Sequence, residues 1–316
     1  MSAENQARFW GDKRYYSLDY YLKQTFGEKV YRLSLNGGMT CPNRDGTLDT
    51  RGCIFCSAGG SGDFAGNPDQ SISGQIASQR ELLRRKRPAG KFIAYFQAYT
   101  NTYAPVSYLE RIFTEAADHP DIAVLSIATR PDCLGADVLD LLERLNARKP
   151  VWVELGLQTV HEDTAAFIRR GYELPCFEEA VKNLRSRNLD VIVHTILGLP
   201  GEEEERILQT MEYLNQQDIQ GIKLQLLHIL SHTDLAAFYR LHPFHVLTME
   251  EYIHLVIRCL EHLSPDLTIH RLTGDGPGKL LIAPDWSRAK RTVLNELHRE
   301  MKRLDTWQGR LYKSPV

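Results

Sequence analysis

The chain has 316 residues, of which 43% are hydrophobic and 25% charged, and its formal net charge is −2. This composition is typical of a globular protein and excludes a global basic footprint for nucleic acid. No apolar run approaches the roughly 18 residues of a membrane-spanning helix. The N-terminal segment lacks the apolar stretch of a secretory signal, so we expect a cytoplasmic protein without membrane association.

Apolar runs alternate with amphipathic stretches along most of the chain, and the pattern predicts its elements in order. Strands are expected at 30–38, 91–99, 122–131, 151–159, 189–201 and 221–230, with a seventh candidate at 267–275. Helices are expected at 71–87, 107–118, 136–148 and 203–216. The strand segments are nearly continuous apolar runs, as in parallel sheets covered on both faces. The alternation therefore predicts an α/β fold whose barrel-like parallel sheet carries its site at the C-terminal ends of the strands.

The two ends of the chain differ from this repeating pattern. Residues 1–29, rich in Tyr and charge, are expected to form an N-terminal cap. Residues 30–283 are expected to form the barrel, and 284–316 a C-terminal helical extension.

The stretch MTCPNRDGTLDTRGCIFCSAGGSG, residues 39–62, places Cys41, Cys53 and Cys56 on one Gly-rich loop after the first expected strand. Clustered thiols in a reducing compartment favour metal binding or catalysis over disulfides. Zinc usually takes four protein ligands, and no further Cys or His occurs between residues 33 and 118, although a distant His keeps zinc open as an alternative. A redox dithiol is disfavoured because CIFC does not open a helix. Three thiolates suit a [4Fe–4S] cluster with one iron left open. The scattered cysteines are expected to be structural: Cys133, Cys176 and Cys259.

The arrangement Cys41-x11-Cys53-x2-Cys56 resembles a widened CxxxCxxC motif of the radical S-adenosylmethionine (SAM) enzymes. With the surrounding NGGMTCPNRDGTLDTRGCIFCSAGGSGDFAG, it resembles the YhcC/YtqA-like group, related to the radical SAM domain of the Elongator catalytic subunit. The resemblance runs from about Tyr15 to Arg310. It implies a partial (β/α)6-type parallel barrel and a [4Fe–4S] cluster on the three cysteines. It further implies SAM at the open iron, cleaved to a 5′-deoxyadenosyl radical that abstracts hydrogen.

The resemblance also implies residues that contact SAM, each of which has an ordinary structural reading beside it. Phe55 would approach the adenine, or simply pack the loop. Gln158 in VELGLQT would contact the ribose or the methionine part. Arg170 would hold the methionine carboxylate, with Arg169 as the alternative, although a surface Arg is equally compatible. The HTILGLPGE turn would cover the adenine and ribose, through His194, Gly198 and Pro200.

Two further strand segments carry polar candidates. Glu154 lies at even spacing from Gln158 and so faces the same side, where an inward carboxylate needs a partner. In the related enzymes a Gly-Gly-Glu motif follows the second strand; YFQAY replaces it here, and Gln97 or Tyr99 is the substitute. No catalytic side chain is assigned.

The YhcC/YtqA-like resemblance implies a tRNA substrate: conversion of 5-carboxymethylaminomethyluridine at the wobble position to 5-aminomethyluridine, with a flavodoxin or ferredoxin as electron donor. Basic stretches at 80–91 and 288–303 are candidates for phosphate contacts, and Tyr99 and Tyr103 for base stacking. The densest basic patch is expected at Arg84, Arg85, Lys86 and Arg87. The alternatives are a radical enzyme acting on a small molecule and a zinc-bearing RNA-binding protein.

Overall fold

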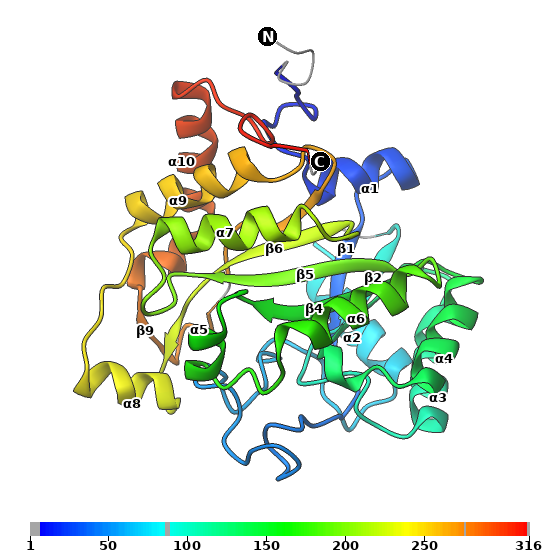
Figure 1. Ribbon diagram of the computed structural model, residues 1–316. Helices are drawn as coiled ribbons and strands as arrows, with labels where there is room; N and C mark the ends of the chain where they lie inside the picture. The colour runs from blue at the N-terminus through cyan, green and yellow to red at the C-terminus, as the bar shows by residue number, and fades with distance from the viewer. Residues whose placement is uncertain (1–6, 86–88, 275, 315–316) are drawn as a thin grey trace. The chain divides into compact units, whose positions relative to one another are not determined.

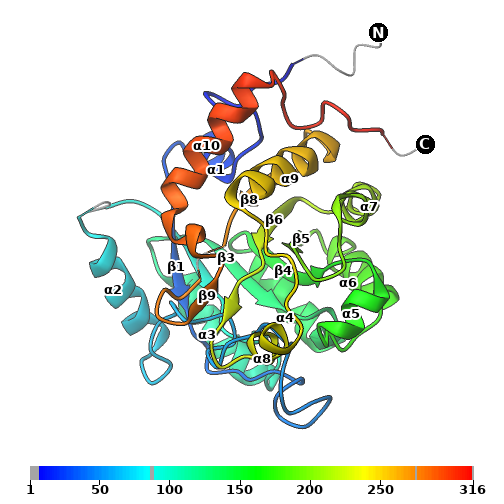
Figure 2. The ribbon, with the colours of Figure 1, turned by 90° about the vertical axis from the view of Figure 1, so that its left-hand side faces the viewer.

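The structure is a computed structural model that describes residues 7–85, 89–274 and 276–314. Most of its strands are labelled in Figure 1, and β3 and β8 in Figure 2. They are β1 (Tyr31–Leu35), β2 (Phe92–Phe96), β3 (Ile122–Thr129), β4 (Val151–Gln158), β5 (Asp190–Leu197), β6 (Gly221–Leu226), β7 (Ile229–Leu230), β8 (Thr268–Arg271) and β9 (Leu281–Ala283). Within these residues, seven strands form one sheet in the order β1-β2-β3-β4-β5-β6-β8, and β7 pairs with β9.

Helices separate most of these strands. They are α1 (Leu18–Phe26), α2 (Ile72–Leu83), α3 (Val106–Asp118), α4 (Ala136–Asn146), α5 (Glu162–Phe167), α6 (Leu174–Arg185), α7 (Glu204–Leu214), α8 (Asp234–Leu241), α9 (Met249–His262) and α10 (Lys290–Arg303), with short 3₁₀ helices η2 (Pro131–Cys133) and η3 (Asp285–Ala289). No helix in this part of the chain is both long and apolar enough to cross a membrane.

The expected strands are all present, and the candidate seventh strand is confirmed as β8, which pairs in parallel with β6. The segment 221–230 differs from expectation, because it divides into β6 and the separate β7. The expected helix at 71–87 is shorter, since α2 ends at Leu83. The pairings β1–β2, β2–β3 and β3–β4 are parallel, as the apolar pattern predicts.

The chain divides into two compact units. One, which we call the cysteine-loop unit, comprises Leu22–Gly156 and Gly171–Ile192. The other, the carboxy-terminal unit, comprises Met1–Tyr21, Leu157–Arg170 and Val193–Val316. The strands β4 and β5 contribute residues to both.

One face of the sheet in the cysteine-loop unit is apolar and covered by helices. Leu35, Phe96 and Ile127 are register partners on β1, β2 and β3, and all three are fully buried. The Phe96 ring meets Phe113 of α3 edge to face at 4.9 Å, and α2 lies along β1 (Figure 2). This packing explains why β2 is a continuous run of buried residues.

The opposite face of the same sheet is polar. Arg32 of β1 lies over the Tyr95 ring at 4.7 Å and within 4.0 Å of the Glu154 carboxylate. Ser126 donates its hydroxyl to Glu154 at 2.6 Å. Glu154 is fully buried, so Arg32 and Ser126 are partners for the inward carboxylate that the sequence predicts.

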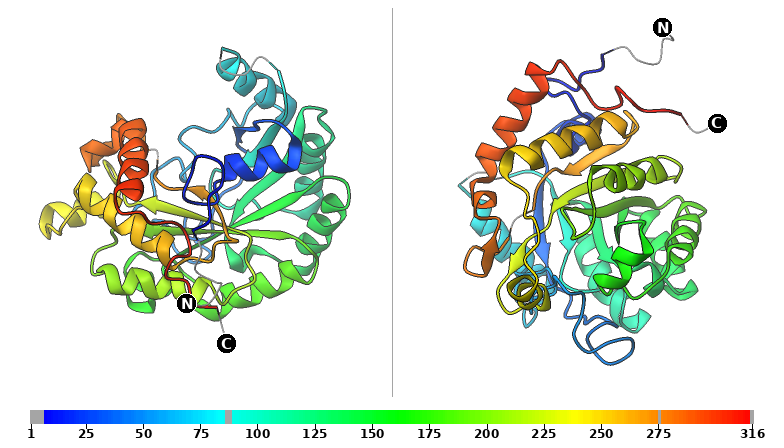
Figure 3. Two further views of the ribbon diagram at one scale, coloured as in Figure 1. Left: turned by 90° about the horizontal axis from the view of Figure 1, so that it is seen from above. Right: turned by 60° about the vertical axis from the view of Figure 1, so that its left-hand side comes forward.

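In the carboxy-terminal unit, a glutamine joins segments from both ends of the chain. α9 packs against α7 and α10 (Figure 3). The segment before α1 lies beside β8, because the Ile269 N–H donates a hydrogen bond to the Tyr16 carbonyl at 2.7 Å. The fully buried Gln308 accepts from the Tyr16 N–H at 2.8 Å. Its amide donates to the carbonyls of Ser264 and Leu267 at 2.6 and 2.8 Å.

Replacing Gln308 with Ala should therefore leave three backbone groups without their partner. We expect the free energy of unfolding in urea to fall by about 3 kcal/mol or more, since each of the three unsatisfied groups costs at least about 1 kcal/mol. Gln209→Ala, on the exposed side of α7, is the matched control and should change stability by less than about 0.5 kcal/mol. Equal effects of the two substitutions would contradict the role assigned to Gln308.

Candidate functional site

The three clustered cysteines lie on the long loop between β1 and α2, at the C-terminal edge of the parallel strands. Eleven residues, 42–52, separate Cys41 from Cys53. Backbone hydrogen bonds within this excursion bring its two ends together. The Leu48 N–H donates to the Pro42 carbonyl at 2.9 Å, and the Gly52 N–H to the Asn43 carbonyl at 2.6 Å. The widened spacing therefore still returns Cys53 to the vicinity of Cys41.

The three thiols influence one another electrostatically. Burial, with smaller contributions from the charges of Cys56 and Cys41 and opposed by Arg130, raises the pKa of Cys53 to about 12. As they stand, no three His, Cys, Asp or Glu side chains in the described residues converge at metal-ligand distance. The donor set is nevertheless three soft sulfur ligands, the chemistry that iron–sulfur clusters use.

Arg130 places a buried positive charge beside these thiols. Its guanidinium binds Asp132 through two hydrogen bonds of 2.9 and 2.7 Å and lies 5.3 Å from the Tyr172 ring centre. Burial alone would lower the pKa of Arg130, but Asp132 and the thiols of Cys41 and Cys53 raise it. The side chain is thus a fixed cation facing two prospective thiolates.

Residues on the cysteine loop supply further N–H groups. Asn43 directs its amide at the Cys53 sulfur, 3.6 Å away. Arg44 donates to the carbonyls of Cys56 and Ser57 at 3.0 and 2.7 Å. Burial would lower the pKa of Arg44, and the charge of Cys56 raises it. The loop thus places an N–H donor next to the Cys53 sulfur and a guanidinium next to the Cys56 backbone.

Close backbone packing fixes the loop beyond Cys56. Tyr99 donates its hydroxyl to the Ala58 carbonyl at 2.5 Å, and Gln97 donates to the Ser61 carbonyl at 2.6 Å. Gly60, at φ +59°, passes under the Tyr99 ring so closely that a Cβ there would lie 2.3 Å from a ring carbon. Both side chains considered as substitutes for the Gly-Gly-Glu motif thus hold this backbone.

The predicted SAM-contacting residues fall into two groups. Phe55 lies half-buried on the cysteine loop, in the same unit as the three cysteines. The others lie in the carboxy-terminal unit, on β4 and β5 or in the segments that follow them. They are Gln158 (last residue of β4, φ +65°), the fully buried Arg170, His194 within β5, and Gly198 (φ +88°) and Pro200 after it.

Within the carboxy-terminal unit, hydrogen bonds tie the LQT and GLPGE motifs together. Thr159 donates its hydroxyl to the carboxylate of Glu202, and burial raises the pKa of Glu202. Arg170 donates to the Thr159 carbonyl and to Glu162, each at 2.8 Å. The segments that follow β4 and β5 therefore form one hydrogen-bonded assembly.

Sequence reasoning missed the polar neighbours of the thiols, namely Asn43, Arg44, Arg130 and Asp132. The signal for the last two was the polar stretch ATRPD, because it follows the third strand at the edge where parallel sheets carry their sites. Cys133, expected to be structural, also lies near this edge: burial raises its pKa to about 12, and Asp132 and Cys41 contribute.

Two protein-family profiles match most of the chain. The profile of the radical SAM superfamily matches residues 50–214, and that of the Radical_SAM C-terminal domain matches residues 219–303. YtqA of Bacillus subtilis (strain 168) is 44% identical over 302 residues, which cover 96% of this chain and 94% of YtqA. YhcC of Escherichia coli (strain K12) is 38% identical over 279 residues, 88% of this chain and 89% of YhcC.

Two further matches are more distant. The tRNA uridine(34) acetyltransferase of Methanocaldococcus jannaschii is 34% identical over 91 residues, 29% of this chain and 16% of that protein. The structure of Elp3 from Methanocaldococcus infernus, with an N-terminal deletion, aligns with a TM-score of 0.67 at 15% identity, covering 88% of this chain and 64% of that one. The latter confirms the predicted fold class, an α/β partial parallel barrel with a C-terminal helical extension. The chain belongs to the radical SAM superfamily, whose members use a [4Fe–4S] cluster and S-adenosylmethionine.

Proposed function

We propose that this radical SAM enzyme modifies tRNA, at the wobble uridine. The observation that carries the proposal is the match to a protein named for its action on tRNA uridine 34, and the fold shared with Elp3 supports it. The reaction we propose is conversion of 5-carboxymethylaminomethyluridine to 5-aminomethyluridine. The carbon between the amine and the carboxylate is oxidised by two electrons, which conversion of SAM to methionine and 5′-deoxyadenosine takes up, and water then releases the two-carbon group as glyoxylate. A flavodoxin or ferredoxin would be the electron donor that reduces the cluster.

We propose that Cys41, Cys53 and Cys56 hold the cluster. When bound, the cluster and SAM supply a one-electron cleavage that yields a hydrogen-abstracting radical. The support is the closed 42–52 excursion and the coupling among the thiols. Around them, Asn43, Arg44 and Arg130 would offset the negative charge of the three thiolates.

The proposed SAM contacts are Phe55, Gln158, His194, Gly198 and Pro200. Arg170 already gives two N–H groups to Thr159 and Glu162, so we propose that it acts by holding the end of β4 that carries Gln158. Gln158 adopts a left-handed backbone conformation at φ +65°, and such conformations persist where the surroundings enforce them.

Two observations argue against RNA contacts by the basic stretches: the position of the first stretch and the ion pairs of the second. Arg84 follows the end of α2, on the approach to the start of β2, whereas the cysteine loop follows the end of β1. It therefore lies at the opposite edge of the sheet; Lys86 and Arg87 lie outside the described residues. In the second stretch, 288–303, three of the four arginines pair with acids three residues earlier: Arg288, Arg299 and Arg303.

The cysteine assignment predicts a sharp division among alanine variants. Cys41→Ala, Cys53→Ala and Cys56→Ala should each lose most of their iron and the absorbance near about 400 nm after anaerobic reconstitution, because each removes one thiolate ligand. Cys133→Ala is the matched control, since its thiol lies nearby but faces Asp132. Iron loss in the control, or retention in Cys53→Ala, would contradict the assignment.

The position of Arg130 predicts an electrostatic effect on reduction. Arg130→Gln should keep its iron but lower the midpoint potential on the order of 100 mV, because loss of a nearby positive charge disfavours the reduced, more negative cluster. A redox titration followed by electron paramagnetic resonance measures this. Arg148 is an exposed arginine paired with Asp118, so Arg148→Gln is the control and should leave the potential unchanged. An unchanged potential in Arg130→Gln would contradict the proposal.

The substrate proposal is tested by the nucleosides of bulk tRNA. Cells without the gene should accumulate 5-carboxymethylaminomethyluridine and lack nucleosides derived from 5-aminomethyluridine. The wild-type gene should restore the profile, whereas the Cys53→Ala gene should not. An unchanged profile in the deletion strain would remove tRNA as the substrate and leave a small-molecule reaction of the same cofactors.

A further inference from the structure

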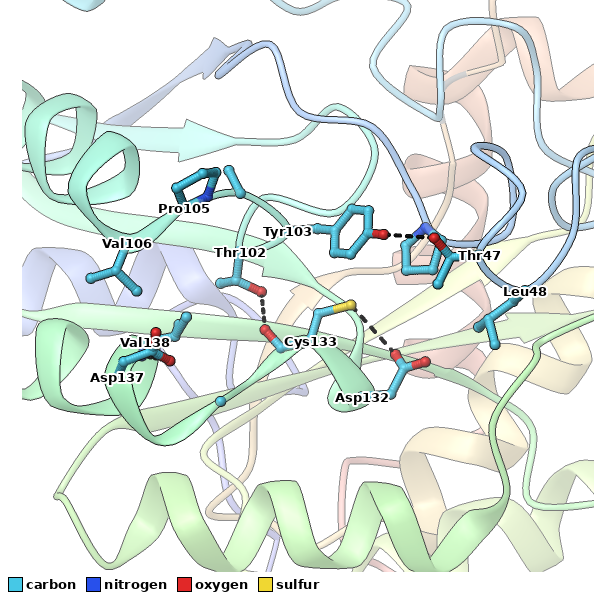
Figure 4. Close-up of a pocket in the computed structure, with 13 residues that line it drawn as sticks. Thr47, Leu48, Thr102, Tyr103, Pro105, Val106, Asp132, Cys133, Asp137 and Val138 are labelled. Carbon is cyan, nitrogen blue, oxygen red and sulfur yellow. Dashed lines mark hydrogen bonds between the residues drawn. The ribbon is translucent and has the colours of Figure 1, made fainter.

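A pocket of about 690 Å³ opens beside the cysteine loop, within the cysteine-loop unit (Figure 4). Three segments at the same strand edge form it: residues 42–48 of the cysteine loop, residues 102–106 after β2, and residues 132–138 after β3. Pro42, which follows Cys41 directly, lines the pocket. Cys133, whose pKa responds to Cys41, lines it as well. The pocket is therefore adjacent to the proposed cluster ligands.

An aromatic ring in a fixed orientation lines this pocket. The hydroxyl groups of Tyr103 and Thr47 are hydrogen-bonded at 2.9 Å, and the Tyr103 N–H donates to the Thr100 carbonyl at 3.1 Å. Tyr99, the other aromatic expected to stack a base, has its hydroxyl bonded to Ala58 and its ring packed over Gly60. Of the two tyrosines, Tyr103 is thus the one that lines a cavity large enough for a planar ligand.

The remaining walls combine apolar surface with hydrogen-bond acceptors. Pro42, Leu48 and Val138 provide apolar contacts, and Leu48 is 52% exposed at the rim. Asp132 has both carboxylate oxygens engaged by Arg130. Asp137 accepts one hydrogen bond, from the Val138 N–H at 2.9 Å, and is otherwise exposed. Asp137 therefore retains acceptor capacity for a ligand.

This chemistry selects among ligand classes. Two carboxylates disfavour a phosphate or another anion in the pocket. An aromatic ring and apolar walls suit a planar group, and a carboxylate with free lone pairs suits a ligand that donates hydrogen bonds. Nucleobases with an exocyclic amino group have both properties, and single-stranded RNA loops present such bases splayed out for stacking on aromatic side chains.

We propose that the Tyr103 pocket binds a splayed-out, amino-bearing nucleobase of the RNA substrate, with the base stacked on Tyr103 and its amino group donating to Asp137. This inference rests on the proposed RNA substrate and adds to it a base that the enzyme reads beside the uridine that it modifies. The base would position the RNA next to the cysteine loop without taking part in the chemistry.

The test uses the anaerobically reconstituted holoenzyme and a fluorescently labelled anticodon stem-loop RNA, with binding followed by anisotropy. Tyr103→Ala should weaken binding about 10-fold, in the range measured for loss of one base–aromatic stack. Tyr103→Phe keeps the ring and should bind as the wild type does. Leu48→Ala, at the exposed rim, is a second variant that should also weaken binding. Iron content and thermal unfolding should match the wild type in all three.

Specificity is tested by replacing each amino-bearing loop base with uridine, one at a time. At one position the replacement should weaken binding to the wild-type protein but not to Tyr103→Ala or Asp137→Ala, because a lost contact cannot be lost twice. The proposal is overturned if Tyr103→Ala and Leu48→Ala bind every stem-loop as tightly as the wild type. It is also overturned if they slow reduction by flavodoxin at unchanged RNA affinity, since a redox protein would then be the occupant.

These outcomes are separable from failure of the proposed function. If the nucleoside profile depends on the gene but the pocket variants bind RNA normally, tRNA remains the substrate and the base site lies elsewhere. If the profile does not depend on the gene and the wild-type holoenzyme binds no stem-loop, both proposals fall together.

Discussion

The guanidinium of Arg44 closes the cysteine loop. It donates to the carbonyls of Cys56 and Ser57 and lies over the Tyr99 ring at 5.8 Å. Gly52, at φ +75°, passes beneath it, where a Cβ would come within 2.8 Å of the guanidinium nitrogen. One side chain from the start of the loop therefore fixes the backbone that carries the last cysteine. Without such a link, a loop of this length would lose too much conformational entropy on ordering to hold three thiols together.

Positive charge near the cysteine loop offsets the negative charge of the thiolates. Thiolates in a partly buried site need compensation, because an uncompensated buried charge is costly. Arg130 meets that need as a cation whose own position is set by Asp132 and Tyr172. On the polar face of the same sheet, Glu154 is likewise accompanied by Arg32 and Ser126. The unit thus keeps charged groups in its interior by giving each one partners on neighbouring strands.

Local sequence patterns predicted the parallel strands and the cysteine loop, because apolar periodicity and thiol spacing are local properties. They did not predict the break between β6 and β7, since residues 222–230 contain no Gly, Pro, Asn or Asp that would signal a turn, and only pairing with β9 separates β7. Arg130 was missed because a single Arg after a strand has no distinguishing spacing; its proximity to Cys41 and Cys53 arises from the adjacency of β1, β2 and β3. The same limit applied to Tyr99 and Tyr103, which are equivalent in sequence but take up different environments.

The excursion from residue 42 to 52 forms part of both the cysteine loop and the neighbouring pocket. Its hydrogen bonds return Cys53 to Cys41, and its residues Pro42, Thr47 and Leu48 form one wall of the neighbouring pocket. The closing hydrogen bonds use backbone groups of Pro42 and Leu48, whereas the pocket wall is formed by the side chains. For protein engineering this separates two properties: side chains at positions 42, 47 and 48 can be exchanged to alter the pocket wall without changing the chain length that returns Cys53 to Cys41.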